Sequence, residues 1–205
     1  MKKILFSIVA LFVFNVQSLN AQAIHEGSVL VDAYYGFPNL YTSVYKGLYA
    51  NSGSELNVNI GSAGPLGLRA EYLISDKVGF GLDLGFNSTT ISYDSQTYDA
   101  SLNPITYNYK YSTRKIGALV SFNYHFVEDD NFDAYFVVGM GYGSRSFDVT
   151  SNDPTMVKPN WKSVVPVASK IGVGMRYFFT ENIGANFALG LGQGGIINVG
   201  LSAKF

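Results

Sequence analysis

Apolar residues alternate with glycine, asparagine or charged residues in eight segments of about ten residues each, all downstream of residue 26. The clearest segment, VGFGLDLGF, runs from Val78 to Phe86. A period of two is that of a β-strand, whose successive side chains point to opposite faces. Since no comparable helical period with capping residues occurs in this part of the chain, the pattern predicts an all-β fold.

The eight predicted strands are joined by connections that alternate in length. The strands cover residues 29–37, 66–72, 78–86, 116–126, 134–142, 167–179, 183–191 and 197–205. Short polar turns are expected near 75–77, 128–131 and 180–182, and long loops near 38–64, 94–105 and 144–163, with a tight connection at 192–195. Short turns on one rim and long loops on the other predict an eight-stranded antiparallel up-and-down transmembrane β-barrel.

The alternation leaves open whether the apolar face lines a soluble barrel or faces lipid, and the opposite face decides between them. Most of the 22 glycines fall on that opposite face. Glycine weakens a water-facing strand, whereas inside a narrow barrel it leaves room for long polar neighbours. The same phase carries charged residues of both signs, which predict a polar network in the lumen: Asp32, Arg69, Glu71, Asp83, Lys170, Arg176 and Lys204. The apolar face is therefore expected to contact lipid.

Aromatic residues gather at the ends of the apolar segments, as the two interfacial girdles of a membrane barrel require. The short-turn side carries Tyr72, Phe80, Tyr124, Phe126, Tyr177, Phe179 and Phe205. The long-loop side carries Tyr35, Phe37, Phe86 and Tyr142.

The first 23 residues resemble an export signal. Lys2 and Lys3 precede a mostly apolar stretch that is shorter than the ~20 residues of a spanning helix, and Ala21-Gln22-Ala23 offers a cleavage site. We expect a signal peptide at 1–23, a mature chain beginning near Gln22 or Ile24, and one barrel domain over 24–205. The chain has no cysteine, which excludes a disulfide scaffold, a thiol nucleophile and a lipoprotein anchor.

The mature sequence resembles the small eight-stranded outer-membrane barrels of Gram-negative bacteria, the OmpA/OmpX-like and porin-like families. Its last strand closes on Phe205, and Gly200, Ala203 and Phe205 match the spacing of the C-terminal signal that the barrel-assembly machinery recognises in such proteins. The resemblance implies an outer-membrane location, contact with outer-membrane lipid, and periplasmic chaperones and the assembly machinery as partners during biogenesis. Unlike full-length OmpA, the chain is expected to carry no peptidoglycan-binding part after the barrel.

Candidate groups for chemistry are few. Of the two histidines, His25 precedes the first strand, and His125 is expected to face the lumen in a hydrogen-bonded packing role. Ser121 lies four residues from His125 on the same face, and Asp129 and Asp130 follow in the adjacent turn. The sequence predicts no catalytic residue, no metal and no cofactor. A net charge of −1 also provides no basic surface for nucleic acid.

Three functions remain open for a monomeric barrel of this kind. The inward charges could plug the lumen of a protein with a structural or cell-surface role, or they could line a narrow porin-like channel for ions or small solutes. A lipid-modifying enzyme is the third and least favoured hypothesis. Loop tyrosines among Ser, Asn and Gly suit contact with an extracellular ligand. The strands around Tyr93 and Tyr107 are also expected to rise about 37 Å, beyond an apolar band of ~25 Å.

Overall fold

The computed structural model describes residues 23–50, 58–98, 101–127, 129–162 and 165–205. Eight long strands and one short strand dominate these residues, together with one helix. The elements are β1 (Val29–Phe37), α2 (Leu40–Ala50), β2 (Asn59–Ser75), β3 (Val78–Tyr98), β4 (Pro104–His125), β5 (Phe132–Ser151), β6 (Asn160–Lys162), β7 (Val167–Phe178), β8 (Ile183–Gly192) and β9 (Ile197–Lys204).

The eight long strands form a closed antiparallel ring. Each pairs with its neighbours in the order β4-β3-β2-β1-β9-β8-β7-β5, and β4 pairs with β5 to complete the circle. The first and last strands join along most of β1, from Leu30 opposite Lys204 to Phe37 opposite Ile197. Closure leaves no unpaired sheet edge within the ring, which is what a lipid environment demands of a β-structure. The predicted all-β, eight-stranded up-and-down barrel is confirmed.

Two prolines lie where the first two strands separate. Pro38 has no backbone N–H to donate to a ladder, and β1 ends immediately before it at Phe37. Pro65 follows Gly64 at a register shift between Ala63 and Leu66 in the pairing of β2 with β3. Beyond this point β2 continues along β3 alone, so the wall of the barrel opens out into a protruding sheet.

The helix α2 corrects the expectation that residues 38–64 form only a loop. Asn39 caps it, because its side-chain oxygen accepts a hydrogen bond from the backbone N–H of Thr42 at 3.3 Å. The helix contains Gly47 and several β-branched or aromatic residues, so its sequence carries little intrinsic helical preference. Contacts with the sheet support it instead: Asn39 donates to Asn87 at 2.7 Å, and the hydroxyls of Thr42 and Thr89 lie 3.2 Å apart.

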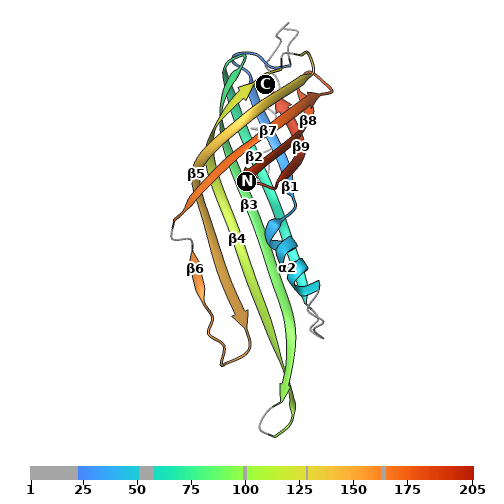
Figure 1. Ribbon diagram of the computed structural model, residues 1–205, viewed down its shortest axis with the longest axis vertical. Helices are drawn as coiled ribbons and strands as arrows, with labels where there is room; N and C mark the ends of the chain where they lie inside the picture. Colours follow the sequence, from blue (N-terminus) through green and yellow to red (C-terminus); the bar gives the residue numbers. More distant parts are fainter. Residues whose placement is uncertain (1–22, 51–57, 99–100, 128, 163–164) are drawn as a thin grey trace, which may run out of the picture.

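The strands on the long-loop side run well past the ring (Figure 1). β3 has 21 residues and β4 has 22, paired without interruption from Val78 opposite Tyr124 to Tyr98 opposite Pro104. The pairing of this hairpin continues past the predicted Tyr93 and Tyr107, to Tyr98 and Pro104. β5 also continues, to Ser151, and the short β6 pairs with this extension. The expected loops at 94–105 and 144–163 are therefore shorter than the sequence suggested.

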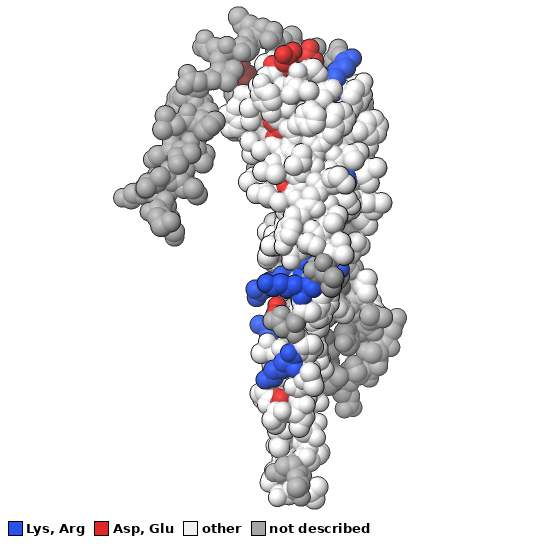
Figure 2. Space-filling model, turned by 90° about the vertical axis from the view of Figure 1, so that its left-hand side faces the viewer, with Lys and Arg blue, Asp and Glu red and all other residues white. Residues whose placement is uncertain are grey.

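The outer wall of the ring is apolar, and the inner wall is polar. Leu68, Leu82, Val120, Ile171 and Leu201 lie on the ring portions of their strands and are half exposed, whereas the charged residues of the opposite phase are buried. Figure 2 shows this wall as a broad pale band, with basic side chains gathered on the protruding part and acidic ones at the short-turn end. The predicted girdle aromatics lie on the same outer face. Among the described residues, no helix is long and apolar enough to cross a membrane.

Glycines of the inner wall leave room for large side chains that lie against them. A Cβ at Gly67 would overlap the ring of Tyr34, one at Gly174 would overlap the ring of Tyr135, and one at Gly79 would overlap Glu71. The expectation that inward glycines make room for long polar neighbours is confirmed at these positions.

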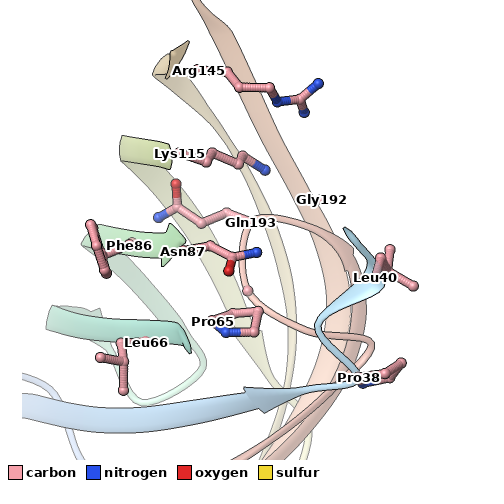
Figure 3. Close-up of a pocket in the computed structure, with 12 residues that line it drawn as sticks. Pro38, Leu40, Pro65, Leu66, Phe86, Asn87, Lys115, Arg145, Gly192 and Gln193 are labelled. Carbon is pink, nitrogen blue, oxygen red and sulfur yellow. The ribbon is translucent and has the colours of Figure 1, made fainter. Parts of the chain in front are cut away.

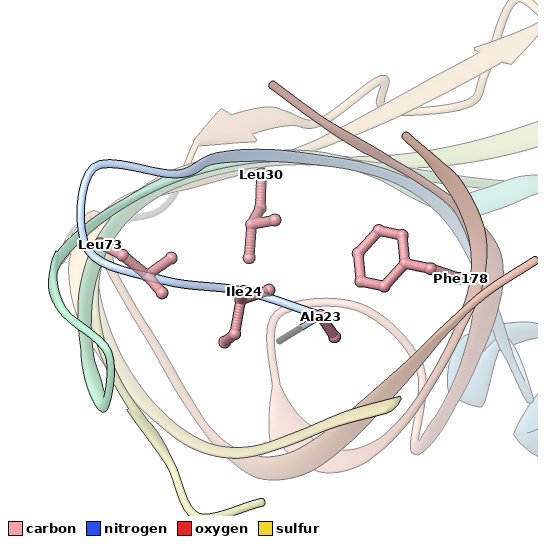
Figure 4. Close-up of a cluster of buried hydrophobic side chains, with 5 residues drawn as sticks. All are labelled: Ala23, Ile24, Leu30, Leu73 and Phe178. Carbon is pink, nitrogen blue, oxygen red and sulfur yellow. The ribbon is translucent and has the colours of Figure 1, made fainter. Parts of the chain in front are cut away.

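An apolar cap fills the short-turn end of the lumen (Figure 4). Ile24 and Ala23 lie inside the ring against Leu30, Leu73 and Phe178, all buried. The backbone N–H of Ala23 donates to the carbonyl of Asp129 at 2.7 Å, and that of Gly27 donates to Leu73 at 2.9 Å. Apart from Ala23, the predicted signal peptide lies outside the described residues, and its cleavage stays a prediction.

Arginine at position 82 is expected to destabilise the barrel in lipid. Leu82 lies at mid-height on the outer wall, where a cation loses its hydration, so Leu82→Arg should cost ~2–4 kcal/mol of unfolding free energy. Thr90→Arg is the matched control, because Thr90 has the same outward phase on the protruding part of β3, opposite Gly61 and Ser112. Urea titration of both variants in lipid vesicles measures the difference. Equal losses would contradict the lipid-facing assignment.

A methyl group at position 174 is expected to push on the buried ring of Tyr135. We predict that Gly174→Ala lowers the unfolding free energy by about 1–3 kcal/mol, since the fully buried ring has no free space to move into. Gly61→Ala on β2 is the control, because a Cβ there meets nothing within 4 Å. The same urea titration applies, and a loss at Gly61 as large as that at Gly174 would show that backbone effects, not the ring, are responsible.

Candidate functional site

The centre of the lumen holds a cluster of charged side chains contributed by six of the strands. We call it the central ion-pair cluster, and its members are Asp32, Arg69, Glu71, Asp83, His125, Asp133, Lys170 and Arg176. Each is at most 5% exposed. Strand alternation places them there, because each occupies the inward phase of its strand.

Arg176 on β7 connects three carboxylates from three other strands. Its Nη2 lies 2.8 Å from Asp32 on β1 and 2.7 Å from Glu71 on β2, and its Nη1 lies 2.7 Å from Asp133 on β5. Its Nε also donates to Asp32 at 3.0 Å. A planar guanidinium suits such multiple contacts because its donors diverge in one fixed plane. The residue thus ties opposite parts of the wall together across the lumen.

His125 bridges two of the same carboxylates. Its Nδ1 lies 2.6 Å from Asp133, and its Nε2 lies 2.9 Å from Glu71. An ionised carboxylate has no proton to donate, so both hydrogen bonds require a ring N–H and the ring is the imidazolium. The acids that face His125 are therefore Glu71 and Asp133, not the Asp129 and Asp130 of the nearby turn. With both nitrogens engaged, the ring cannot act as a general base toward Ser121.

A second group of contacts lies nearer the long-loop side, around Asp83. Lys170 approaches its carboxylate at 2.6 Å, and the hydroxyl of Tyr34 donates to it at 2.8 Å. Gln193, from the tight connection after β8, donates to both the carboxylate and the backbone carbonyl of Asp83. The ammonium of Lys170 also lies 4.8 Å from the centre of the Tyr34 ring. These side chains fill the lumen above the Arg176 contacts.

The charges of the central ion-pair cluster balance. Its four carboxylates face two guanidiniums and one ammonium, and the imidazolium of His125 supplies the remaining positive charge. The ring of Tyr135 packs against both guanidiniums, with Arg176 4.3 Å and Arg69 5.1 Å from its centre. Balanced pairing offsets the cost of removing these groups from water, which for a lone buried ion amounts to several kcal/mol.

Six of the seven residues predicted for the lumen network lie in this cluster, and Lys204 does not. Lys204 is the last residue of β9 at the short-turn rim, where its ammonium donates to the backbone carbonyl of Ala23 at 2.7 Å. Within the cluster, Arg69 lies 3.1 Å from Asp32, while Glu71 contacts Arg176 and His125. Arg69 and Glu71 share the inward face of β2, yet each of them meets its partner on another strand.

Sequence analysis missed Asp133, Tyr34, Tyr135 and Gln193. Asp133 precedes the predicted fifth strand by one residue, yet it has the inward phase of Tyr135 and Val137, so extending the alternation would have found it. The two tyrosines also have the inward phase but were overlooked because aromatic residues were assigned to the outer girdles. Gln193 lies in a turn, where no periodicity indicates the direction of a side chain.

The long-loop mouth of the barrel holds a cavity of about 230 Å³ (Figure 3). Lys115 on β4 and Arg145 on β5 extend into it from one side, while Gln193 and Asn87 lie below them. A second cavity of about 230 Å³ lies further out, bounded by Tyr45, Thr113, Arg145, Phe147 and Trp161. Arg145 lines both cavities.

An aromatic ladder crosses the protruding sheet. Tyr93 stacks on Tyr109 with ring centres 5.2 Å apart, Tyr111 lies between Tyr93 and Phe147, and Phe147 stacks on Trp161 at 5.8 Å. At its far end, the hydroxyl of Tyr109 donates to Asp153 at 2.8 Å. Hydrogen bonds from Thr155 and Tyr109 lower the pKa of the Asp153 carboxyl group. The ionised carboxylate connects this turn to Tyr109 of β4.

An apolar wall around a charged lumen is the reverse of a soluble barrel, and it is the organisation of a membrane-spanning one. The chain has the fold of a small eight-stranded transmembrane β-barrel. Among the described residues, no group of His, Asp and Glu has the arrangement of a metal site.

No family model matches the sequence, and no curated protein matches it either. Among solved structures, the chain is similar to the N-terminal β-barrel domain of OprF from Pseudomonas aeruginosa, with 16% identity, a TM-score of 0.47, and coverage of 89% of this chain and 100% of that one. It is also similar to the outer-membrane protein OprG of Pseudomonas aeruginosa, with 15% identity, a TM-score of 0.45, and coverage of 88% and 97%. It is similar as well to Ail, the attachment invasion locus protein of Yersinia pestis, with 11% identity, a TM-score of 0.36, and coverage of 88% of this chain and 99% of that one. The assignment of the fold rests on the strand pairing of this chain itself.

Removing the charge of Arg176 is expected to destabilise the barrel strongly. Arg176→Met keeps much of the side-chain volume but leaves Asp32, Glu71 and Asp133 without their shared cation, at a cost of about 3–5 kcal/mol of unfolding free energy. The double variant with Glu71→Gln should recover part of the loss, because one carboxylate charge is removed. Arg114→Met, on the exposed outer face of β4, is the control and should change stability by less than about 0.5 kcal/mol. No recovery in the double variant would argue against charge pairing as the cause.

Proposed function

We propose that the protein is an integral outer-membrane barrel with a closed lumen, and that its role is structural or lies in cell-surface interaction. The observation that supports this most directly is the central ion-pair cluster. Arg176 spans the lumen to three carboxylates, and the Asp83 contacts fill the next level. An eight-stranded interior is just wide enough for side chains to fill, so such a cluster leaves no continuous water path.

The apolar cap supports the same proposal from the other end. Ile24, Leu30, Leu73 and Phe178 place apolar atoms across the short-turn mouth. A solute that passed the charged level would next meet a surface that offers it no hydrogen bonds, which is unfavourable for ions.

The protruding part of the molecule supports an extracellular interaction. In our proposal the short turns face the periplasm and the extended β3, β4 and β5 project outside the cell, as in barrels of this architecture. The aromatic ladder and α2 give this extension a defined side-chain surface. Export through a cleaved signal peptide, a monomeric state, and recognition of Gly200, Ala203 and Phe205 by the barrel-assembly machinery belong to the same proposal.

A narrow porin-like channel for ions or small solutes is the alternative function. Buried polar atoms without a hydrogen-bond partner in the described lumen, on Ser121, Asn123 and Tyr135, leave some capacity to bind water or ions. We propose that these atoms lie in separated pockets rather than along a path, because the central ion-pair cluster lies across the lumen.

Refolded protein in planar bilayers is expected to show no steady single-channel openings. The heat-modifiable gel shift of a folded barrel confirms that silence comes from folded protein. Arg69→Glu and Glu71→Arg are the informative variants, because both side chains lie in the cluster and reversing either charge disrupts its balance. Steady wild-type openings whose ion selectivity changes in these variants would overturn the closed-lumen proposal and favour the channel.

A further inference from the structure

The outward face of the protruding sheet carries a row of polar side chains directly above the apolar wall. Ser88, Arg114, Ser146 and Lys162 are successive partners in the register of β3, β4, β5 and β6, and we call them the boundary row. Arg114 lies two residues from the outward Ile116, so the row has the outward phase. Both cations are exposed. Figure 2 shows basic side chains gathered where the pale band ends.

The depth of the boundary row matches that of lipid head groups. Phe126 and Ile116 lie ten positions apart on the outer face, one near each end of the apolar wall. At ~3.3 Å per residue and a tilt of ~45°, this stretch rises about 23 Å, close to the ~25 Å apolar band of a membrane barrel. Ile116 opposes Phe86 of the long-loop girdle. Arg114 therefore lies just outside the band, where acyl chains give way to head groups.

The two cations of the boundary row have no acidic partner among the described residues. None of the ion pairs of these residues includes Arg114 or Lys162. Asp148 lies one row further out, opposite Ser112, and is engaged by another residue. The backbones of Arg114 and Lys162 are two strand spacings apart, about 10 Å, which two long side chains can span to meet at one group. An anion from outside the protein would complete the row.

The side chains of the boundary row suit a phosphate group. The guanidinium of Arg114 offers paired N–H donors in the geometry of two phosphate oxygens, and Lys162 adds a compact positive charge. The hydroxyl groups of Ser88 and Ser146 can donate to further oxygens. Directly below the row, the wall is apolar and suits hydrocarbon. A molecule that carries a phosphate group next to acyl chains would satisfy both surfaces at once.

We propose that the boundary row binds the phosphate group of a lipid in the outer leaflet, whose acyl chains lie along Phe86 and Ile116. The inference rests on the proposed function in one respect, that this end of the barrel faces the cell exterior. The ligand is a lipid rather than a soluble phosphate, because the row adjoins the lipid-facing wall and lines neither of the two cavities at the mouth.

Native mass spectrometry of the refolded protein in detergent tests the site. The protein is titrated with diphosphorylated lipid A, with phosphatidylcholine and with inorganic phosphate, and the bound fraction is recorded. Lipid A should bind at concentrations about tenfold or more below those of the other two, since phosphatidylcholine carries its own cation and free phosphate has no acyl chains. Arg114→Gln and Lys162→Gln should each weaken lipid A binding by about tenfold.

Lys110→Gln is the matched control. Lys110 is an exposed cation on the same face of β4, four residues further from the wall than Arg114. Its replacement should leave lipid A binding unchanged, and the heat-modifiable gel shift confirms that each variant is folded. The inference is overturned if Lys110→Gln weakens binding as much as Arg114→Gln, which would indicate diffuse attraction. It is also overturned if phosphatidylcholine or inorganic phosphate binds as tightly as lipid A.

The orientation of the barrel is tested separately, because the chain has no cysteine. Gln96→Cys places a single thiol on the exposed outer part of β3, and a membrane-impermeant maleimide added to intact cells should label it. Absent labelling together with normal lipid A binding would overturn the proposed orientation. Labelling together with lipid A binding that does not depend on the boundary row would overturn this inference alone.

Discussion

Charges inside this barrel must pair with one another because the lumen is too narrow to hydrate them. Arg176 meets that constraint by contacting carboxylates from three strands, and His125 joins two of the same groups from the other side. Each contact links strands that are far apart around the ring, so the cluster braces the wall from within. The inward glycines follow from the same constraint: the rings of Tyr34 and Tyr135 fit only where the facing wall carries no Cβ.

Filling the lumen also determines where interaction with other molecules can occur. The central ion-pair cluster and the apolar cap occupy two levels of the barrel, and the outer wall carries the apolar residues that face lipid. Among the described residues, the extension of β3, β4 and β5 carries accessible polar and aromatic side chains. There the strands continue beyond the ring, and inward-phase residues such as Lys115, Arg145 and Phe147 line open cavities instead of a packed interior.

Local patterns predicted some elements better than others. Period-two alternation located all eight ring strands and their outward residues, because one phase must be apolar along the whole membrane-facing length. The extension of β5 to Ser151 was missed, since outside the membrane neither face needs to be apolar. The helix α2 was missed because its stability comes from Asn39 and Thr42 contacting β3, which no property of residues 40–50 reveals.

The sequence by itself determined the barrel, its inside and outside, and the residue types that share the lumen, because strand alternation assigns a face to every residue without knowledge of its neighbours. Only the tertiary structure decided which charges pair. Asp32 meets Arg176 from 144 positions away, and Lys170 meets Asp83 from 87 positions away. It also placed Lys204 at the rim and set Lys115 beside Arg145 and Gln193 at the mouth. Such contacts depend on the register and closure of the ring, which bring together side chains that no local spacing relates.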